Sequence, residues 1–145
     1  MTRAVLIAGI AAIAGLALAG AVSLAQEGAT GETRTVEIRS YALKPGMHQR
    51  FRRLFDEEAF PMLKRAGIDV VAFGPSLHEE NSWFLMRSFS SVSERQASED
   101  AFYGSREWRE GPRDAVLDCI ESYTTVVVEL DGKTVEELRK IAGGK

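Results

Sequence analysis

Three polar side chains that could do chemistry alternate along residues 35–43: Glu37, Arg39 and Tyr41. Residues two apart on a β-strand point to the same side of a sheet, so we expect these three in one row, with Val36 and Ile38 on the opposite side. A guanidinium binds a carboxylate or another anion through two parallel hydrogen bonds, and a phenol adds a further donor. The row is therefore a candidate ligand site, although Glu37 and Arg39 could equally form structural ion pairs with a neighbouring strand or a second subunit.

Three further residues are candidates for the same site. His78 lies in a polar loop, where an imidazole could serve as a base or a ligand at a pocket mouth, or be only a polar surface group. Trp83 and Arg87 belong to the segment 82–90, which is rich in strand formers, and they could add an aromatic wall and a second guanidinium. Aromatic residues at strand spacing are also typical of a hydrophobic core.

The sequence contains no motif of an established reaction. It has no nucleophile elbow, phosphate-binding loop, dinucleotide fingerprint or cysteine–histidine pair with catalytic spacing. Cys119 is the only cysteine and follows an apolar helical pattern, which predicts a buried thiol and excludes an internal disulfide. The two histidines are too far apart for a metal site, so we expect neither a metal nor a cofactor. Whether the protein is an enzyme stays open, and no catalytic residue is assigned.

Composition favours one globular domain. The 145 residues are 45% hydrophobic and 27% charged, and the formal charge is −3, which argues against a nucleic-acid-binding surface. Residues 1–25 have one basic residue, an apolar run and a Ser-Leu-Ala ending, which is typical of a signal peptide cleaved before Gln26. We expect a periplasmic or secreted protein, or a membrane-anchored one if this segment is retained.

The rest of the chain divides into a flexible linker at 26–34, a folded domain at 35–131 and a helical tail at 132–145. The domain begins with a strand, a Lys-Pro-Gly turn and an amphipathic helix from residue 47, which Pro61 should kink and Gly67 should end. Two strands joined by a loop follow, at 69–75 and 82–90. Ser91 and Glu94 have the spacing of a capping box for a helix over 92–102. After a turn, a helix restarts at 111–120, and the last strand is 123–130.

The order β-α-β-β-α-β predicts an α+β, ferredoxin-like fold with a four-stranded antiparallel sheet. Helices on one side would leave the other side bare, showing Glu37, Arg39 and Tyr41 with one alternate set from 82–90, either the set of Trp83 and Arg87 or the set of Phe84 and Met86. A second copy packed sheet against sheet would cover this surface and enclose a cavity. We therefore expect a homodimer.

Several stretches resemble the NIPSNAP family of the dimeric α/β-barrel superfamily: VEIRSYALKPG, EEAFPMLKRAG, FSSVSERQASEDAF and REW. The resemblance spans about residues 36–128. It implies a ferredoxin-like protomer and a homodimer formed through the sheets, but little chemistry. The leading hypothesis is a domain that binds a small apolar or anionic ligand, or a protein, in the cavity between the sheets. The alternative is a cofactor-independent monooxygenase or isomerase of the superfamily, with His78 or Glu37 as its base.

Overall fold

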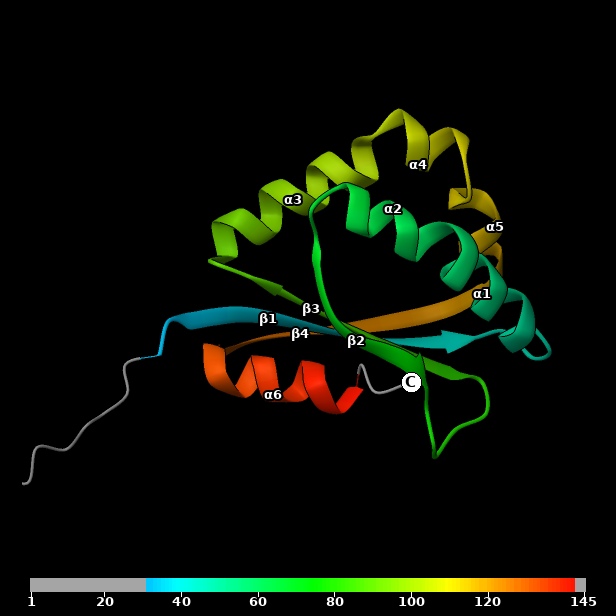
Figure 1. Cartoon of the computed structure of the whole chain (residues 1–145). Helices are drawn as coiled ribbons and strands as arrows, with labels where there is room; N and C mark the ends of the chain where they lie inside the picture. The colour runs from blue at the N-terminus through cyan, green and yellow to red at the C-terminus, as the bar shows by residue number, and fades with distance from the viewer. Residues whose placement is uncertain (1–30, 143–145) are drawn as a thin grey trace, which may run out of the picture.

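Four antiparallel strands form one sheet in the order β2-β3-β1-β4 in the computed structural model, which describes residues 31–142 (Figure 1). The strands are β1 (Thr33–Leu43), β2 (Asp69–Pro75), β3 (Ser82–Phe89) and β4 (Ile120–Asp131). The first and third strands of the chain are central, as in a ferredoxin-like domain. The predicted α+β fold is therefore confirmed. The predicted leader and residues 26–30 of the predicted linker lie outside the described residues.

Helices cover one side of this sheet, which we call the helix face (Figure 1). They are α1 (His48–Leu54), η1 (Phe55–Ala59), α2 (Phe60–Arg65), α3 (Val92–Gly104), α4 (Arg106–Glu110) and α5 (Arg113–Cys119). The first three form one continuous helix with a π turn in its middle. At this turn the amide of Phe60 donates to the carbonyl of Phe55, five residues back, immediately before Pro61. Because proline has no N–H, it disturbs the regular bonding of this helix, and the structure shows this as a π turn where a kink was predicted.

Two local signals of the sequence behave as expected. Gly67 has a φ of 73°, a left-handed conformation that favours glycine, and it follows Ala66, the C-cap residue of α2. Ser91 Oγ accepts from the amide of Glu94 at 3.1 Å, and the Glu94 carboxylate accepts from the amide of Ser90, one residue before the usual position. This capping fixes the start of α3, the helix that faces the charged row of β1.

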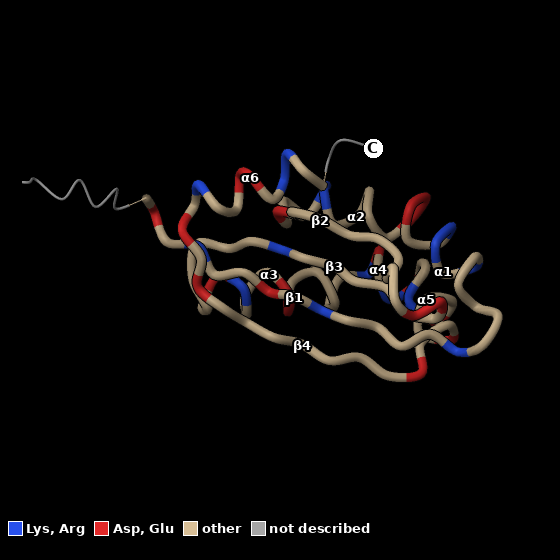
Figure 2. Tube along the Cα trace, turned by 90° about the horizontal axis from the view of Figure 1, so that it is seen from below, with Lys and Arg blue, Asp and Glu red and all other residues tan. Residues whose placement is uncertain are grey.

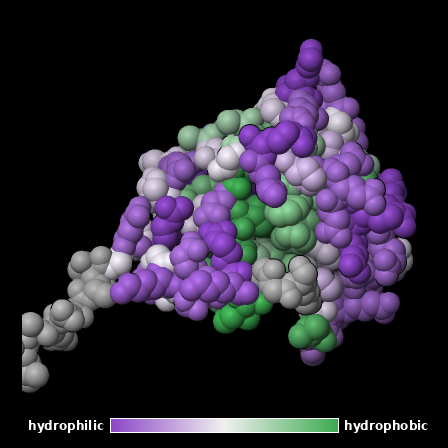
Figure 3. Space-filling view, viewed as in Figure 1, coloured by the Kyte–Doolittle hydropathy of each residue, from purple (hydrophilic) through white to green (hydrophobic). Residues whose placement is uncertain are grey.

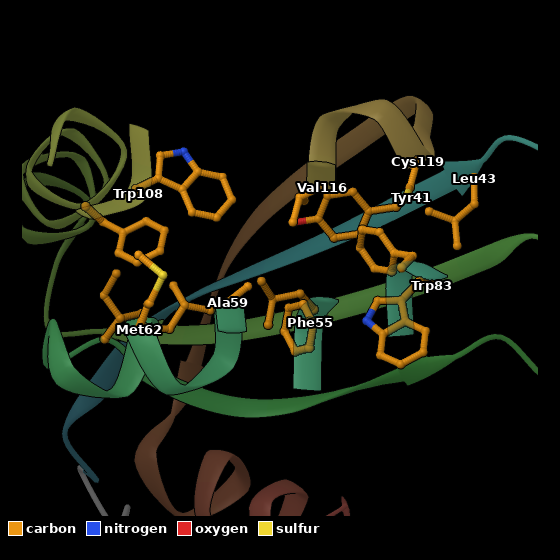
Figure 4. Packing of buried hydrophobic residues seen from close by; sticks show 14 of the residues in the cluster. Tyr41, Leu43, Phe55, Ala59, Met62, Trp83, Trp108, Val116 and Cys119 are labelled. Atoms are coloured by element: carbon orange, nitrogen blue, oxygen red, sulfur yellow. The ribbon is translucent and has the colours of Figure 1, made fainter. Parts of the chain in front are cut away.

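The main core lies between the helices and the helix face (Figure 4). Trp83 of β3 is 2% exposed and contacts Phe51 and Phe55, with ring centroids 5.7 and 5.8 Å apart. Cys119 is fully buried in this core, as predicted. On the side of the edge strand β2, apolar side chains also reach the surface between the helical layer and the sheet, framed by hydrophilic ones (Figure 3).

The second face of the sheet is partly covered by α6 (Gly132–Ala142), which lies on the side of β2 (Figures 1 and 2). Val135 of this helix is 2% exposed and packs in a small second core with Val36 and Val71. Arg139 fastens the helix to β2 by contacts to the Asp69 carboxylate at 2.8 and 2.9 Å. The predicted helical tail is thus part of the folded domain. Within residues 31–142, no helix is long and apolar enough to cross a membrane.

Candidate functional site

A network of five charged side chains lies where α3 packs on the helix face. Glu37 of β1 and Arg87 of β3 are directly opposite each other in the sheet, and both are fully buried. Opposite charges at such positions stabilise the strand pairing. Helix α3 adds Arg95 and Glu99, four residues apart and therefore on one side of the helix. We call Glu37, Arg39, Arg87, Arg95 and Glu99 the charge network.

The glutamates of the network are shared among the arginines. Arg87 Nη2 donates to both Glu37 and Glu99. Arg95 Nε donates to Glu37 at 2.5 Å, and its Nη2 lies 2.9 Å from Glu99 Oε2. Figure 2 shows basic positions in blue within β1 and within β3, away from the ends of the strands. Since an unpaired buried charge is very costly, these contacts are what allow Glu37 and Arg87 to be buried.

Arg39 connects the network to the edge strand β4. Its side chain is 11% exposed, and its Nη2 lies 3.1 Å from Glu37 and 3.0 Å from Glu99. Its Nη1 donates to the Tyr103 hydroxyl at 3.0 Å, and its Nε donates to Thr125 at 3.2 Å. The guanidinium also lies over the Tyr123 ring, 5.1 Å from the centroid, in cation–π distance.

Burial and the neighbouring arginines set the protonation of the network. Burial opposes ionisation of Glu37, but the hydrogen bond and charge of Arg87 outweigh it, so the pKa of Glu37 lies below its ordinary value. Burial raises the pKa of Glu99, and the nearby Glu37 carboxylate raises it further although Arg87 acts in the opposite direction. Burial likewise raises the pKa of Tyr41, which stays a neutral phenol. Glu99 is therefore the carboxyl group of the network that holds a proton more firmly.

A cleft of about 490 Å³ opens above Arg39, between the helices α3 to α5 and the strands β1 and β4. One wall is apolar, from α4 and α5, and the other is polar, from α3. Tyr123 stands on the edge strand and is 58% exposed. We call this space the cleft; its lining residues are Arg39, Tyr41, Gln96, Glu99, Asp100, Tyr103, Trp108, Arg113, Val116, Leu117, Ile120 and Tyr123.

The prediction for the row on β1 is correct in part and wrong in part. Glu37, Arg39 and Tyr41 do lie on one side of the sheet, but this is the helix face and not the bare one. The bare-surface prediction is wrong because α3 supplies the counter-charges that let the polar row be buried, while α6 covers Val36 on the other side. Of the two sets of β3, the one with Phe84 and Met86 is on the second face.

The remaining predicted site residues are scattered. Arg87 belongs to the charge network but lies too deep to line the cleft. Trp83 is a core residue, which agrees with the interpretation of strand aromatics as core. His78 lies in the loop between β2 and β3 with 92% of its side chain exposed, and its Nε2 is 3.6 Å from the Glu79 carboxylate. His78 is therefore not at the cleft.

Sequence reasoning missed the residues of α3. Glu99 and Tyr103 lie four residues apart, one turn beyond Arg95, so the three share one side of the helix. Their pairing with the charges of β1 and β3 could have been found by asking which helix neutralises a buried polar row. Among residues 31–142, no three His, Cys, Asp or Glu side chains are grouped so that they could hold a metal ion.

Comparison with known proteins gives one family. The family model described as NIPSNAP matches residues 36–128. Among solved structures, a NIPSNAP family protein from Agrobacterium tumefaciens is 16% identical with a TM-score of 0.64, covering 71% of this chain and 90% of its own. A second one from that organism, described as of unknown function, is 20% identical with a TM-score of 0.63, covering 69% and 90%.

A solved structure with a lower TM-score has a different description. It is a Bordetella bronchiseptica protein named as a candidate antibiotic biosynthesis monooxygenase, 23% identical with a TM-score of 0.52, covering 68% of this chain and 95% of its own. At these identities the structures support the fold alone. No curated protein matches the chain.

Proposed function

The chain belongs to the NIPSNAP family, and from its cleft we propose that the domain binds a small organic anion with a flat apolar body. The observation behind this proposal is the meeting of Arg39, Tyr103 and Tyr123 at the cleft. Arg39 supplies positive charge, and the two rings flank its guanidinium, at 5.9 and 5.1 Å. Pockets for small ligands commonly combine apolar walls with a few such polar groups.

The donors of the site outnumber its acceptors. The charge network holds three arginines and two glutamates, which leaves one positive charge in excess. The N–H bonds of Arg39 face Thr125, Tyr103, Glu37 and Glu99, and its guanidinium also lies beside the Tyr41 phenol. The Tyr103 hydroxyl accepts from two arginines, Arg39 at 3.0 Å and Arg87 at 3.3 Å, so its own hydrogen is free to donate. A carboxylate in the cleft would accept the Tyr103 hydrogen and lie next to the positive charge of Arg39.

The apolar wall suits a flat ring. Trp108, Val116, Leu117 and Ile120 face the cleft opposite the polar residues of α3. Trp108 is 6% exposed and held against the Tyr103 ring at 5.7 Å, so this wall is fixed before a ligand arrives. A preformed wall lowers the entropic cost of binding.

The test is titration calorimetry with 2-naphthoate, a flat ring with one carboxylate. We expect saturable binding to the wild-type protein and an affinity about tenfold lower in Tyr103→Phe, since a hydrogen bond to a charged group contributes about 1.5 kcal/mol. His78→Ala is the control, because His78 is exposed and away from the cleft. Absence of saturable heat in the wild-type protein, or equal affinities of wild type and Tyr103→Phe, would contradict the proposal.

A second candidate is the enzyme predicted as the alternative, a cofactor-independent monooxygenase or isomerase. The observation that favours it is Glu99, a carboxyl group with a raised pKa that lines the cleft beside Tyr103. The distant likeness to a candidate antibiotic biosynthesis monooxygenase is in accord with it. The test is exchange of the α-hydrogens of 2-tetralone, a flat carbon acid, in D2O by NMR. Exchange above the buffer rate that disappears in Glu99→Gln would support an isomerase; exchange at the buffer rate would count against it.

We also keep the proposal of a homodimer, now on the part of the second face that α6 leaves uncovered. Val126 of the edge strand β4 is 51% exposed there, in register with Ile38. An exposed apolar edge strand is a surface that proteins usually cover. Sedimentation equilibrium is expected to give a dimer for the wild type and a monomer for Val126→Asp. Val127→Asp, one residue along on the helix face, is the matched control and should stay dimeric.

Export is the remaining part of the proposal and depends on residues 1–25 of the sequence. We propose that the mature protein begins at Gln26 and is periplasmic or secreted, rather than anchored by a retained segment. N-terminal sequencing of protein recovered from the native envelope distinguishes the two. A first residue of Gln26 supports cleavage, and an intact N-terminus in the membrane fraction supports the anchor.

A further inference from the structure

A second hollow adjoins the cleft. It measures about 750 Å³ and is lined by Tyr103, Gly104, Arg106, Arg109, Glu110 and Arg113. Two of these residues, Tyr103 and Arg113, also line the cleft, so the two spaces share a wall. A ligand longer than one ring could therefore extend from the cleft into the second hollow.

The second hollow is basic. We call Arg106, Arg109 and Arg113 the arginine rim. Arg106 is 3.8 Å from Glu110, and Arg113 is 2.7 Å from Asp114, while Arg109 has no ion pair among residues 31–142. Arg109 therefore carries an uncompensated positive charge. Next to it, Arg106 is exposed and only weakly paired with Glu110. Such a group of guanidiniums is suited to binding a carboxylate or a phosphate.

Tyr103 lies at both basic centres. Its hydroxyl is bonded to Arg39 at the cleft, and the same side chain lines the second hollow. Its ring is held edge-on against Phe102 and Trp108, with centroids 5.1 and 5.7 Å away, so its orientation is fixed. One fixed aromatic side chain therefore forms part of both spaces.

Resting on the function proposed above, we infer that the ligand is an aromatic dianion. One anionic group binds at Arg39 and Tyr103, the ring lies against the apolar wall of the cleft, and the second anionic group, at the opposite end of the ring, binds the arginine rim. A singly charged ligand would leave the rim unused.

The experiment compares two probes that share one ring: 2-naphthoate and naphthalene-2,6-dicarboxylate, titrated by calorimetry at fixed ionic strength. We expect the dicarboxylate to bind about three- to tenfold more tightly to the wild-type protein, as for partly exposed ion pairs. Arg109→Gln should remove this preference and leave the affinity for 2-naphthoate unchanged. Arg53→Gln on α1 is the control that changes the net charge equally, away from both hollows, and should keep the preference.

Each other outcome has a definite meaning. Equal affinities of the two probes in the wild type, or loss of the preference in Arg53→Gln as well as in Arg109→Gln, would overturn the inference while the single-anion site stands. Absence of binding for both probes would overturn the proposed function itself and the inference with it. A preference that survives Arg109→Gln but not the double change Arg106→Gln and Arg109→Gln would support a rim in which the two arginines substitute for each other.

Discussion

Replacing Arg87 with methionine removes the centre of the charge network and keeps a long apolar side chain in its place. Arg87 is fully buried and donates to both glutamates. Breaking a buried ion pair by removing one partner costs about 3–5 kcal/mol. Without Arg87, both Glu37 and Glu99 still contact Arg39 and Arg95. For example, Arg39 Nη2 lies 3.1 Å from Glu37 and Arg95 Nη2 lies 2.9 Å from Glu99. We therefore expect a loss at the lower end of this range, about 3 kcal/mol in the free energy of unfolding at pH 7.

Urea unfolding measures this loss. A fall of about 3 kcal/mol lowers the midpoint by about 2 M at the usual slope for a small domain, with the slope unchanged. The wild-type pKa of Glu37 is lowered, so its contribution to stability is complete above its ordinary value of 4.5 and is lost as the pH falls through the folded value. Without Arg87 this pKa should rise, and the difference between variant and wild type should shrink from pH 7 to pH 4.

The matched control is Arg65→Met, which removes an ion pair with Glu107 whose two side chains are 59% and 60% exposed. Its effect should stay below about 1 kcal/mol at either pH, because exposed pairs are screened by solvent. A loss in Arg87→Met no larger than in this control, or a loss that is the same at pH 4 and pH 7, would refute the idea that the network is held together by buried charge.

Three further results are expected. The pKa of Glu99 is raised in the folded protein, so the folded protein binds this proton more firmly than the unfolded chain does. The free energy of unfolding should therefore decline as the pH rises from 4.5 through the pKa of Glu99 in the folded protein. Urea unfolding of Glu99→Gln from pH 4 to 7 should lack this decline. Gly67→Ala should destabilise by about 1 kcal/mol because φ is 73°, whereas Gly104→Ala, in a helix with open space around it, should be neutral or stabilising in thermal unfolding. Val135→Ala should speed amide exchange in α6 but not in α3, because Val135 is the buried anchor of α6.

The order of the elements along the chain and their approximate boundaries could be predicted because local signals specify them. The alternation in β1, the turn residues and the capping residue Ser91 all act within a few positions of the chain. The hairpin of β2 and β3 and the end of the long helix at Gly67 followed from the same kind of signal. The family match over residues 36–128 agrees with the range that the sequence resemblance indicated.

Which side of β1 faces the helices could not be predicted from β1 alone. Hydrophobicity places Val36 and Ile38 inward and Glu37 and Arg39 outward, and this would be correct for a sheet with one covered side. Here the polar row is buried because α3 brings Arg95 and Glu99 to it, and this pairing depends on residues about 60 positions away. The cleft was missed for the same reason, because it exists only where α3 crosses β1.

The π turn of the long helix has a consequence for the length of the chain. A π turn holds one residue more than a regular turn, so the helix contains an insertion that its flanking turns absorb. Deleting Glu57, an exposed residue within Phe55–Ala59, would restore ordinary bonding without rotating Phe51 or Leu63 out of the core. Homologues one residue shorter at this position would therefore be expected to keep the same helix packing, and the gap would mark an evolutionary change in helix winding rather than a change in the fold.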